Sequence, residues 1–563
     1  MIAADARTIA DLPFAAAAAY GDRPAQRARH EGKWVDRSFR ELADRVRGLA
    51  RGLVHGGIEP GDRVCVLAET RPEWSEAGLA ILAAGAVLVP IYPSNAAEEC
   101  EWVIGNSGAR MVICENAAQL LKIHRVRDRL PDLAGTVVID EGGLDRLAAA
   151  GAAAAAGPAG GAALDAELEH RHAALDPDDP SLIIYTSGTT GPPKGCVLTH
   201  RNWLTLCATN EAVSYILPGD VVYLFLPLAH VFAQITQFSC LDAGATLVYF
   251  GGDVRRIVPE LAEVRPTFLP SVPRIFEKLY TAFGAGAAPL SDALFAKVRA
   301  VFGGRLRMAL SGAAPISPAV LEFFQAAGVT VLEGYAMTES CGVGTVNTVE
   351  NLRLGSVGYA APGTRIRIAE DGEVLMSGGN IFAGYWRDPG ATALTLRDGW
   401  LHTGDLGSLD ADGFLTITGR KKDILITAGG KNVAPANLEN DLRQSRWISH
   451  AVVYGDRQPY LVTLLSLDPD EILPWAAERG LPSSMDALAH HPAVLALLQG
   501  VVDDANAKYA RVEQVKRFAV LDRELSQDAG ELTPTLKVKR AVVATNHAAL
   551  LSMLYDSGGA GGR

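Results

Sequence analysis

The chain has 563 residues, of which 48% are hydrophobic and 21% are charged, so it has the composition of a globular protein with more than one domain. Its formal net charge of -12 disfavours a nucleic-acid-binding protein, because that class relies on basic surfaces; a locally basic pocket for a phosphorylated ligand stays open. The seven cysteines are dispersed, which favours reduced thiols in a cytoplasmic protein over a zinc site or a disulfide framework.

No targeting or membrane-spanning segment is expected. Residues 1–20 are rich in Ala but carry Asp5, Arg7 and Asp11, so they lack the apolar core of a signal peptide. The longest apolar run, residues 79–92, is shorter than the roughly 20 residues that cross a bilayer. These features predict a cytoplasmic location and leave peripheral contact with the inner face of the membrane open.

Short apolar runs alternate with helical stretches in the N-terminal half. Helices are predicted at residues 73–84 and 97–106, between strands. This βαβ order predicts parallel sheets covered by helices, and therefore an α/β fold. The predicted strands are residues 63–67, 86–91, 111–113, 221–226, 245–250 and 267–269.

The composition and the predicted pattern of helices and strands change twice along the chain. Residues 148–161 are almost purely Ala and Gly, which predicts a surface loop or linker. Short strands are predicted from about Gly355, and a compact αβ pattern follows Arg420, so we expect domains at residues 1–419 and 420–563. The Gly-rich end is expected to be disordered. The later predicted strands are residues 364–369, 373–377, 414–418, 423–427, 451–454, 462–467 and 517–521, with helices starting at Pro435 and Pro492.

The most informative segment runs from Tyr185 to Gly195 and reads YTSGTTGPPKG. Glycines let the backbone approach an anion, hydroxyl and N–H groups donate hydrogen bonds, and Lys194 adds a mobile positive charge. These properties predict a phosphate-binding loop, although a polar surface turn is the plainer alternative. A Walker A loop is disfavoured, because two prolines precede the lysine and a glycine follows it.

Several other segments carry suitable chemistry, each with a plainer structural explanation. EGYAMTE at residues 333–339 offers an aromatic ring for a base, a hydroxyl for a phosphate and a carboxylate for Mg²⁺, or else forms a buried turn. Asp405 in HTGDLG is suited to ribose hydroxyls, or closes an ordinary turn. The cations of TGRKKD at 418–423 lie at the predicted boundary, which favours a hinge or phosphate role over a solvated cluster.

Three further segments are more ambiguous. SGAAP at residues 311–315 permits close approach to a flat ring, and is otherwise a structural turn. LPLAH at 226–230 contains His230, for which a core role and an orienting role are equally open. TPTLKVKR at 533–540 contains Lys537 and Lys539 and is a candidate catalytic segment or a basic surface patch.

Taken together and in this order, these motifs resemble the adenylate-forming superfamily of acyl- and aryl-CoA synthetases, luciferases and adenylation domains over nearly the whole chain. The resemblance implies an α/β fold with a large N-terminal domain of two α/β subdomains and a small β-barrel-like subdomain, followed by a small mobile α+β C-terminal lid. Three segments are most similar to the long-chain fatty acyl-CoA synthetases: LPLAH at 226–230, GGKNVAP at 429–435 and LTPTLK at 532–537.

The resemblance also implies how the substrates would be held. One set of residues would grip the ATP phosphates, a second would line the adenine, a third would bind the ribose, and a lysine of the C-terminal domain would contribute to cofactor binding. In that order the residues are Thr186, Ser187, Gly188, Thr189, Thr190, Gly191 and Lys194; Gly312, Ala313, Ala314 and Tyr335; Asp405 and Arg420; and Lys431.

The implied catalytic residues are Lys537, Glu339, Thr338 and His230. Thr338 would contact phosphate, Glu339 would bind Mg²⁺, and Lys422 matches the hinge position. Two details depart from the family pattern: Ala336 stands where many relatives have Gly, and the Ser-Gly that commonly precedes the catalytic lysine is missing. Lys539 therefore remains an alternative to Lys537.

The resulting hypothesis is an ATP-dependent, AMP-forming ligase that activates a long-chain fatty acid as an acyl-adenylate and transfers it to coenzyme A, with Mg²⁺ as cofactor. Within the same chemistry, a fatty acyl-AMP ligase that loads a carrier-protein thiol, and a CoA ligase for an aryl or medium-chain acid, remain open. A P-loop ATPase or kinase and a non-catalytic nucleotide-binding relative are disfavoured alternatives. No motif specifies the acid or the oligomeric state, and a homodimer stays open.

Overall fold

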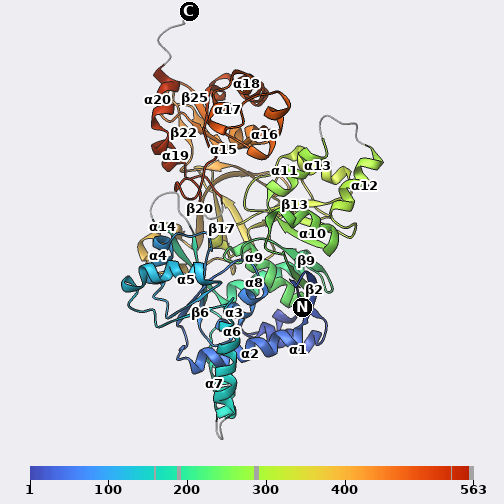
Figure 1. Ribbon diagram of the computed structural model, residues 1–563, viewed down its shortest axis with the longest axis vertical. Helices are drawn as coiled ribbons and strands as arrows, with labels where there is room; N and C mark the ends of the chain where they lie inside the picture. Colours follow the sequence, from blue (N-terminus) through green and yellow to red (C-terminus); the bar gives the residue numbers. More distant parts are fainter. Residues whose placement is uncertain (157–159, 187–191, 285–290, 534–535, 557–563) are drawn as a thin grey trace, which may run out of the picture.

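The computed structural model describes residues 1–156, 160–186, 192–284, 291–533 and 536–556 (Figure 1). A large N-terminal domain of mixed α/β structure is followed by a smaller C-terminal domain, coloured orange to red at the upper end of Figure 1. The predicted α/β class is therefore confirmed. No helix in the described ranges is long and apolar enough to cross a membrane.

The first large sheet has nine strands, in the order β15-β14-β13-β12-β11-β9-β10-β1-β2, and its central strands are parallel. Neighbouring parallel strands end at the same edge, so the segments after β12 and β13 lie next to each other. The strands are β1 Pro24–His30, β2 Lys33–Ser38, β9 Val221–Leu224, β10 Thr246–Tyr249, β11 Phe268–Ser271, β12 Met308–Ser311, β13 Val331–Tyr335, β14 Thr345–Val346 and β15 Tyr359–Ala360.

The second sheet has seven strands, in the order β18-β8-β7-β4-β3-β5-β6. Strands β7 and β8 form an antiparallel hairpin whose connection contains most of the Gly- and Thr-rich motif. The short strand β18 adds to the free edge of β8, which pairs Tyr385 with Cys196. The strands are β3 Arg63–Leu67, β4 Val87–Ile91, β5 Met111–Cys114, β6 Gly135–Val138, β7 Pro180–Thr186, β8 Lys194–Thr199 and β18 Gly384–Tyr385.

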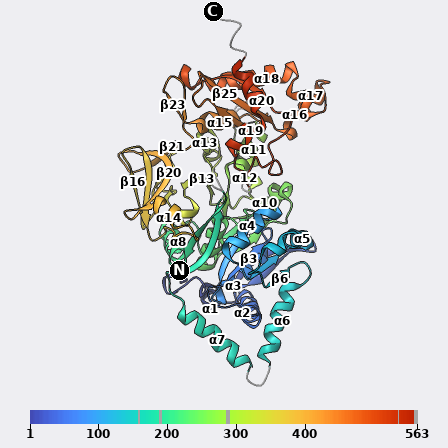
Figure 2. The ribbon, with the colours of Figure 1, turned by 90° about the vertical axis from the view of Figure 1, so that its left-hand side faces the viewer.

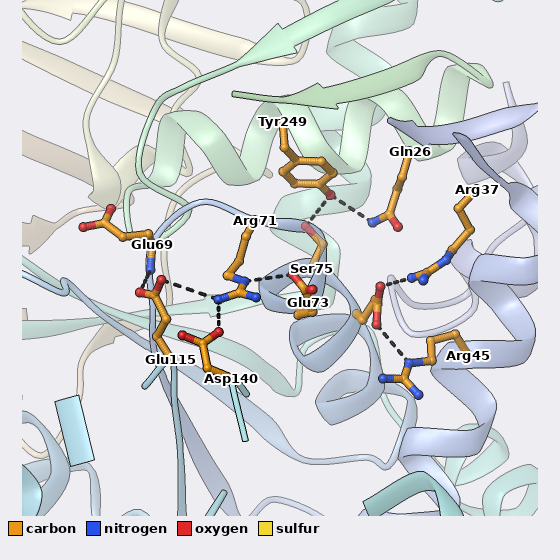
Figure 3. Close-up of polar contacts among 11 residues, drawn as sticks. Gln26, Arg37, Arg45, Glu69, Arg71, Glu73, Ser75, Glu115, Asp140 and Tyr249 are labelled. Atoms are coloured by element: carbon orange, nitrogen blue, oxygen red, sulfur yellow. Dashed lines mark hydrogen bonds and ion pairs between the residues drawn. The ribbon is translucent and has the colours of Figure 1, made fainter. Parts of the chain in front are cut away.

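Helices α3 (Pro72–Ala83) and α9 (Val231–Ala243) are buried along nearly their whole length. A helix that is buried on every side must be covered by structure on every side, and here strands of the large sheets and neighbouring helices, α2 (Phe39–His55) against α3 and α8 (His200–Val213) against α9, provide the cover. Polar contacts join the layers, as Figure 3 shows: the Tyr249 hydroxyl of β10 donates to Ser75 Oγ of α3 at 2.7 Å, and Gln26 Nε2 of β1 donates to Tyr249 at 2.9 Å.

Ion pairs brace the same region (Figure 3). The buried carboxylate of Glu76 accepts from Arg37 of β2 and from Arg45 of α2. Arg71, just before α3, reaches Asp140 at 2.6 Å. These contacts hold α3 against elements that are distant in the sequence.

A third, antiparallel sheet occupies the part of the chain where the β-barrel-like subdomain is expected. Its strands follow the order β16-β17-β20-β19, with β21 beside β20, and the last pairing sets Asp405 opposite Arg420. The strands are β16 Thr364–Ile368, β17 Glu373–Gly378, β19 Leu396–Arg397, β20 Trp400–Leu409 and β21 Leu415–Arg420.

The C-terminal domain contains a three-stranded sheet with its own apolar core. The strands and helices predicted after Arg420 are present, including the helix that starts at Pro435. The elements are β22 Leu425–Ile426, β23 Asn432–Val433, α15 Pro435–Arg443, β24 Ile448–Tyr454, β25 Leu461–Leu467, α16 Pro469–Glu478, α17 Met485–Ala489, α18 Pro492–Asn506, β26 Val515–Val520, α19 Arg540–Asn546 and α20 Ala548–Asp556.

The prediction of a loop over residues 148–161 is wrong. Helices α6 (Gly143–Ala155) and α7 (Gly160–Ala174) cover most of that range and project from the lower end of the molecule (Figures 1 and 2). Gly151 does not break α6, because it lies where α6 crosses α2: a Cβ on Gly151 would be 2.5 Å from the backbone nitrogen of Gly52. Gly151 thus permits close packing of α6 against α2. Residues 157–159 lie outside the described ranges.

The other helices cover the two large sheets. All seven cysteines are buried and unpaired, in agreement with the expected free thiols. The covering helices are α1 Leu12–Tyr20, α4 Ala97–Ser107, α5 Ala117–Val126, α8 His200–Val213, α10 Ile257–Val264, α11 Pro273–Ala282, α12 Asp292–Val301, α13 Pro318–Ala326 and α14 Pro389–Thr395.

Candidate active site

The ends of strands β12 and β13 form one wall of the candidate site. Ala313, in the turn after β12, has a left-handed backbone with φ +69°, which is strained for a residue with a Cβ. A Cβ on Gly312 would be 3.2 Å from the ring of Phe232, so a small residue is favoured there. Ala314 is exposed in the same turn, and Tyr335 ends β13 beside it.

Tyr335, Asp405 and Arg420 form a connected polar group. The Tyr335 hydroxyl donates to Asp405 Oδ2 at 2.6 Å, and Arg420 Nε donates to Asp405 Oδ1 at 2.7 Å. Burial, and then the Asp405 charge, raise the pKa of Tyr335 well above its usual value, so its hydroxyl remains a donor. The motifs around these three residues are separated by up to 85 positions, yet the structure brings them together.

Glu339 and Lys194 both contact Tyr385, a residue that the sequence analysis does not identify. Glu339 is buried in the 3-10 turn Thr338–Ser340, and the Tyr385 hydroxyl donates to its Oε1 at 2.8 Å. Lys194 Nζ lies 5.0 Å from the centre of the Tyr385 ring, within cation–π range. The pairing of β18 with β8 brings Tyr385 here, and this long-range contact leaves no local signal in the sequence.

The remaining predicted residues of this wall lie nearby or outside the described ranges. Thr338 is buried directly before Glu339, and Thr186 Oγ1 lies 3.8 Å from Cys196 Sγ on the adjacent strand. Ser187, Gly188, Thr189, Thr190 and Gly191 lie outside the described residues.

Lys537 comes from the C-terminal domain, and the charges of Arg420, Asp405 and Glu339 act on its ammonium group. Surrounding protein lowers the pKa of its ammonium group by desolvation, and Arg420 lowers it further, whereas Asp405 and Glu339 oppose both effects. Lys537 in turn helps to lower the pKa of His230 to about 4, although burial is the main cause. These mutual effects place Lys537 among the ribose, metal and histidine candidates.

The alternative lysine has a different position. Lys539 is the N-cap of α19, and its backbone N–H donates to the Glu531 carbonyl at 2.7 Å. Its charge is not among the causes of the pKa shifts described for Lys537 and His230. Lys537 is therefore the lysine whose ammonium group is affected by the charges of Arg420, Asp405 and Glu339.

His230 is fixed as a hydrogen-bond donor. Its Nδ1 accepts the backbone N–H of Phe232 at 3.2 Å and so caps helix α9. Because the ring is neutral above about pH 4 and Nδ1 is an acceptor, the proton is on Nε2. This arrangement provides an N–H group at the site rather than a base.

Two predicted residues lie away from the cluster. Lys431 pairs with Glu513 of its own domain at 3.5 Å. Lys422 is exposed in the turn after β21. Neither one has a described contact with Asp405 or Glu339.

A second residue that sequence reasoning missed is Glu333 of β13. It is buried, and the backbone N–H of Ile316, next to the Gly312–Pro315 turn, approaches its Oε1 at 3.5 Å. Burial raises the pKa of Glu333 to about 7. A buried carboxyl with a raised pKa is a feature of functional sites, so Glu333 adds to the case for this wall as a candidate site.

Ion pairs join helix α11 to the C-terminal domain. Arg274 Nη2 donates to Asp468 Oδ2 at 2.5 Å, and Lys278 lies 3.7 Å from Asp470. The half-buried Glu277 faces Arg443 across the same boundary, and each offsets part of the effect of burial on the pKa of the other.

The site combines cations for phosphate groups with a carboxylate suited to a metal. Glu339 uses one oxygen for Tyr385, which leaves lone pairs free for a hard cation such as Mg²⁺. No group of three metal-ligating side chains exists among the described residues. Mg²⁺ fits such a site, because it commonly takes one or two carboxylates and completes its shell with phosphate oxygens and water.

Comparisons with known proteins agree with this geometry. The family described as AMP-binding enzyme matches residues 14–386, and the family of its C-terminal domain matches residues 422–558. A long-chain-fatty-acid–CoA ligase of Mycobacterium bovis, FadD15, is 39% identical over 93% of both chains. Long-chain-fatty-acid–CoA ligase 5 of Rattus norvegicus is 31% identical over 93% of this chain and 84% of its own.

Solved structures show the same fold at lower identity. The adenylation domain of a carboxylate reductase from Mycobacterium chelonae superimposes with a TM-score of 0.79, at 23% identity, over 98% of this chain and 91% of its own. A fatty acyl CoA synthetase of Mycobacterium tuberculosis gives a TM-score of 0.65 at 23% identity, over 97% and 99% of the two chains. The chain therefore belongs to the AMP-binding enzyme family, the adenylate-forming enzymes.

Proposed function

We propose that the protein is an ATP-dependent, AMP-forming long-chain fatty acid–CoA ligase. The observation that carries the proposal is the convergence of Lys537 with Arg420, Asp405 and Glu339 at the ends of β12 and β13. The names of the curated relatives support the choice of acid and of coenzyme A as acceptor.

ATP would lie with its nucleoside against the β12 and β13 wall. Asp405, already oriented by Tyr335 and Arg420, would accept from the ribose hydroxyls. Gly312, Ala313 and Ala314 would face the adenine ring, and the Glu333 carboxylate, which the Ile316 N–H approaches beside this turn, would accept from its exocyclic amino group. This arrangement would account for a buried carboxyl in a wall that is otherwise apolar.

The first half-reaction joins two anions. The fatty carboxylate attacks the α-phosphorus of ATP, the new C–O–P bond forms, and the bond to pyrophosphate breaks. Lys537 and Lys194 would neutralise charge that develops on the phosphate oxygens, and a preorganised contact of this kind contributes about 3–4 kcal/mol. His230 would donate through Nε2 to an oxygen of the acid or the adenylate.

Glu339 and the phosphate oxygens would hold Mg²⁺. When bound, this ion supplies Lewis-acid stabilisation of the phosphate charge. Tyr385 would keep the Glu339 carboxylate in a fixed orientation through its 2.8 Å hydrogen bond.

The second half-reaction transfers the acyl group from AMP to a thiol. The coenzyme A sulfur attacks the acyl carbon, the thioester bond forms, and AMP leaves with the electrons of the broken C–O bond. We propose that residues 420–563 act as a lid that turns about Lys422 between the two steps. Lys431, held by Glu513 away from the cluster, would then be available to the second step.

The preferred length of the fatty acid is the part of the function that is least constrained. Each buried CH₂ group contributes about 0.8 kcal/mol, so two carbons change affinity only about tenfold. Small changes in the walls of an acyl pocket are therefore enough to alter the preferred acid.

The test is acid-dependent ATP–pyrophosphate exchange across saturated fatty acids of increasing length and a set of aryl acids. Product analysis with and without coenzyme A follows. We expect exchange with long-chain acids and an acyl-CoA product that requires coenzyme A. Exchange that is restricted to aryl or medium-chain acids would change the substrate class. A stable acyl-adenylate that coenzyme A does not consume would point to a carrier-protein thiol as acceptor.

A further inference from the structure

Thr70 joins the two large sheets at the segment that carries His230. It lies in the turn between β3 of the seven-stranded sheet and α3, whereas residues 226–230 follow β9 of the nine-stranded sheet. The buried Thr70 hydroxyl donates to the Leu226 carbonyl at 2.8 Å and accepts the backbone N–H of Leu228 at 3.0 Å. One hydroxyl can do both, because it offers a proton and two lone pairs. Thr70 therefore fixes two backbone groups that lie 156 and 158 positions later in the chain.

A second buried side chain holds the same segment. The Leu228 carbonyl accepts from Nε2 of Gln234, a buried residue of α9, at 2.5 Å. Gln237 Nε2 donates in turn to Gln234 Oε1 at 3.2 Å, which orients the Gln234 amide. Both backbone polar groups of Leu228 are therefore bonded to buried side chains, the N–H group to Thr70 and the carbonyl to Gln234.

The backbone that is held in this way leads directly into His230. The His230 N–H donates to the Pro227 carbonyl at 2.8 Å, which closes a tight turn over residues 227–230. On the other side of the histidine, Nδ1 of its ring accepts the backbone N–H of Phe232 at 3.2 Å. The ring is thus tied to the backbone before and after it, and a displacement of Leu228 within the turn would redirect the Nε2–H group.

The turn that contains Thr70 is itself anchored on both sides. The backbone N–H of Glu69 donates to Glu115 Oε2 at 3.0 Å, and Arg71 reaches Asp140 at 2.6 Å (Figure 3). Because Thr70 lies between two anchored residues, its hydroxyl has a stable position from which to make its two hydrogen bonds.

We propose that Thr70 and Gln234 are positioning residues for His230, because together they fix Leu228 and so the direction of the His230 Nε2–H group. This inference rests on the proposed function, in which that group donates to an oxygen of the fatty acid or the adenylate. Neither side chain has to touch a substrate. Displacement of such a group by about 1 Å can reduce a rate by about a hundredfold, so the loss of either support should affect the reaction.

The experiment measures kcat/KM for the fatty acid in ATP–pyrophosphate exchange. Thr70→Val replaces the hydroxyl by a methyl group of similar size and removes both bonds, whereas Thr70→Ser keeps the hydroxyl. We expect Thr70→Val to lower kcat/KM by about ten- to hundredfold and Thr70→Ser to restore most of this loss. The KM for ATP should change little, because His230 donates to the acid or the adenylate.

Gln234→Met provides an independent test from the other side of Leu228. It removes the amide and keeps the length of the side chain, so it should also lower kcat/KM for the fatty acid. If Thr70→Val does not fold, Gln234→Met decides the question.

A His230→Ala background separates positioning from a purely structural role. Thr70 also joins two sheets, so its loss could weaken the whole protein, but such an effect would not depend on His230. If Thr70 acts through His230, Thr70→Val should change kcat/KM by less than about twofold once the imidazole is absent.

Thr246→Val is the matched control. Thr246 begins β10 and so lies at the edge of the nine-stranded sheet opposite to the strand ends of the site. Its buried hydroxyl donates to the Pro24 carbonyl at 2.9 Å. Thr246→Val loses a buried hydroxyl as Thr70→Val does, so it should also lower the melting temperature, yet its exchange should stay close to the parent value.

The results separate this inference from the proposed function. A kcat/KM within about twofold of the parent value in both Thr70→Val and Gln234→Met would overturn the inference, as would an equal loss for Thr70→Val with and without the His230 imidazole. Unchanged exchange in His230→Ala would overturn it as well, since His230 would then have no role that depends on its position. If the unmodified protein shows no acid-dependent exchange, the proposed function itself fails.

Discussion

Arg274 of the N-terminal domain donates its Nη2–H to Asp468 of the C-terminal domain at 2.5 Å, and this ion pair joins the two domains. Asp468 is buried, and Arg274 is about one-third exposed. The pair therefore joins the two domains in the arrangement in which the charges of Asp405 and Glu339 act on the Lys537 ammonium group.

Loss of this ion pair should favour the second half-reaction over the first. Arg274→Ala removes a partly exposed pair of about 1 kcal/mol, which corresponds to a roughly fivefold shift between domain arrangements. We expect pyrophosphate exchange to fall by about that factor. Thioester formation from supplied acyl-adenylate should be unchanged or faster.

Lys278→Ala is the matched control. Lys278 and Asp470 form the neighbouring pair at 3.7 Å, but both side chains are largely exposed, so this pair should contribute almost nothing. An equal effect of the two substitutions, or an equal loss in both half-reactions for Arg274→Ala, would contradict a specific role for Arg274.

Lys537→Ala should slow the first half-reaction far more than the second, and by more than Arg274→Ala does. Its ammonium group lies in the field of Asp405 and Glu339, where phosphate charge develops in the proposed adenylation step. Losing such a contact costs about 3–4 kcal/mol, so pyrophosphate exchange should fall about 10²- to 10³-fold. Thioester formation from supplied acyl-adenylate should persist.

Lys539→Ala distinguishes the two lysines. Lys539 begins α19 and holds Glu531 through its backbone, which alanine preserves. We expect near-parental exchange. Loss of exchange in Lys539→Ala with retention in Lys537→Ala would reverse the assignment.

The sequence predicts the chemistry of the site better than its geometry. Asp405, Arg420 and Lys537 were identified from local motifs, because each motif has a distinctive order of residue types. Tyr385 was not, since its contact with Glu339 depends on the pairing of a two-residue strand with β8. A contact that depends on sheet order has no signature in a local window.

The helical segments show the same limit. The Ala- and Gly-rich residues 148–161 predict a loop or linker, since the backbone freedom of glycine usually disfavours a helix. The structure instead uses Gly151 at a crossing too close for a side chain. The partner residue, Gly52, is about 100 positions away, so only the tertiary fold reveals which effect dominates.

Glu333 should make stability depend on pH near neutrality. Burial raises its folded-state pKa to about 7, whereas an unfolded glutamate titrates near its ordinary value of 4.5. Between these values the folded state binds more protons, so this contribution to stability is complete below about pH 4.5 and is lost as the pH rises to about 7. At 1.36 kcal/mol per pH unit, the loss is about 3 kcal/mol.

Glu333→Gln removes the titrating group and keeps the shape of the side chain. Thermal melting at pH 5 and pH 8 should therefore show the variant gaining stability relative to the parent at the higher pH. Other titrating groups are shared by the two proteins and cancel in the difference. If the melting temperatures of the two proteins differ by the same amount at pH 5 and at pH 8, Glu333 titrates outside this range.

The crossing of α2 and α6 gives a prediction about stability alone. A Cβ on Gly52 would lie 2.2 Å from the backbone carbonyl oxygen of Leu147, and backbone cannot move away as a side chain can. Gly52→Ala should therefore force the helices apart and destabilise the protein by about 1–3 kcal/mol.

Gly48, one turn earlier on the same helix, faces Ala148, and its added Cβ would be at an ordinary 3.8 Å. Gly48→Ala should instead stabilise the helix by about 0.5–1 kcal/mol. Melting temperatures that move in opposite directions would establish the close crossing, and a Gly52→Ala variant as stable as Gly48→Ala would exclude it.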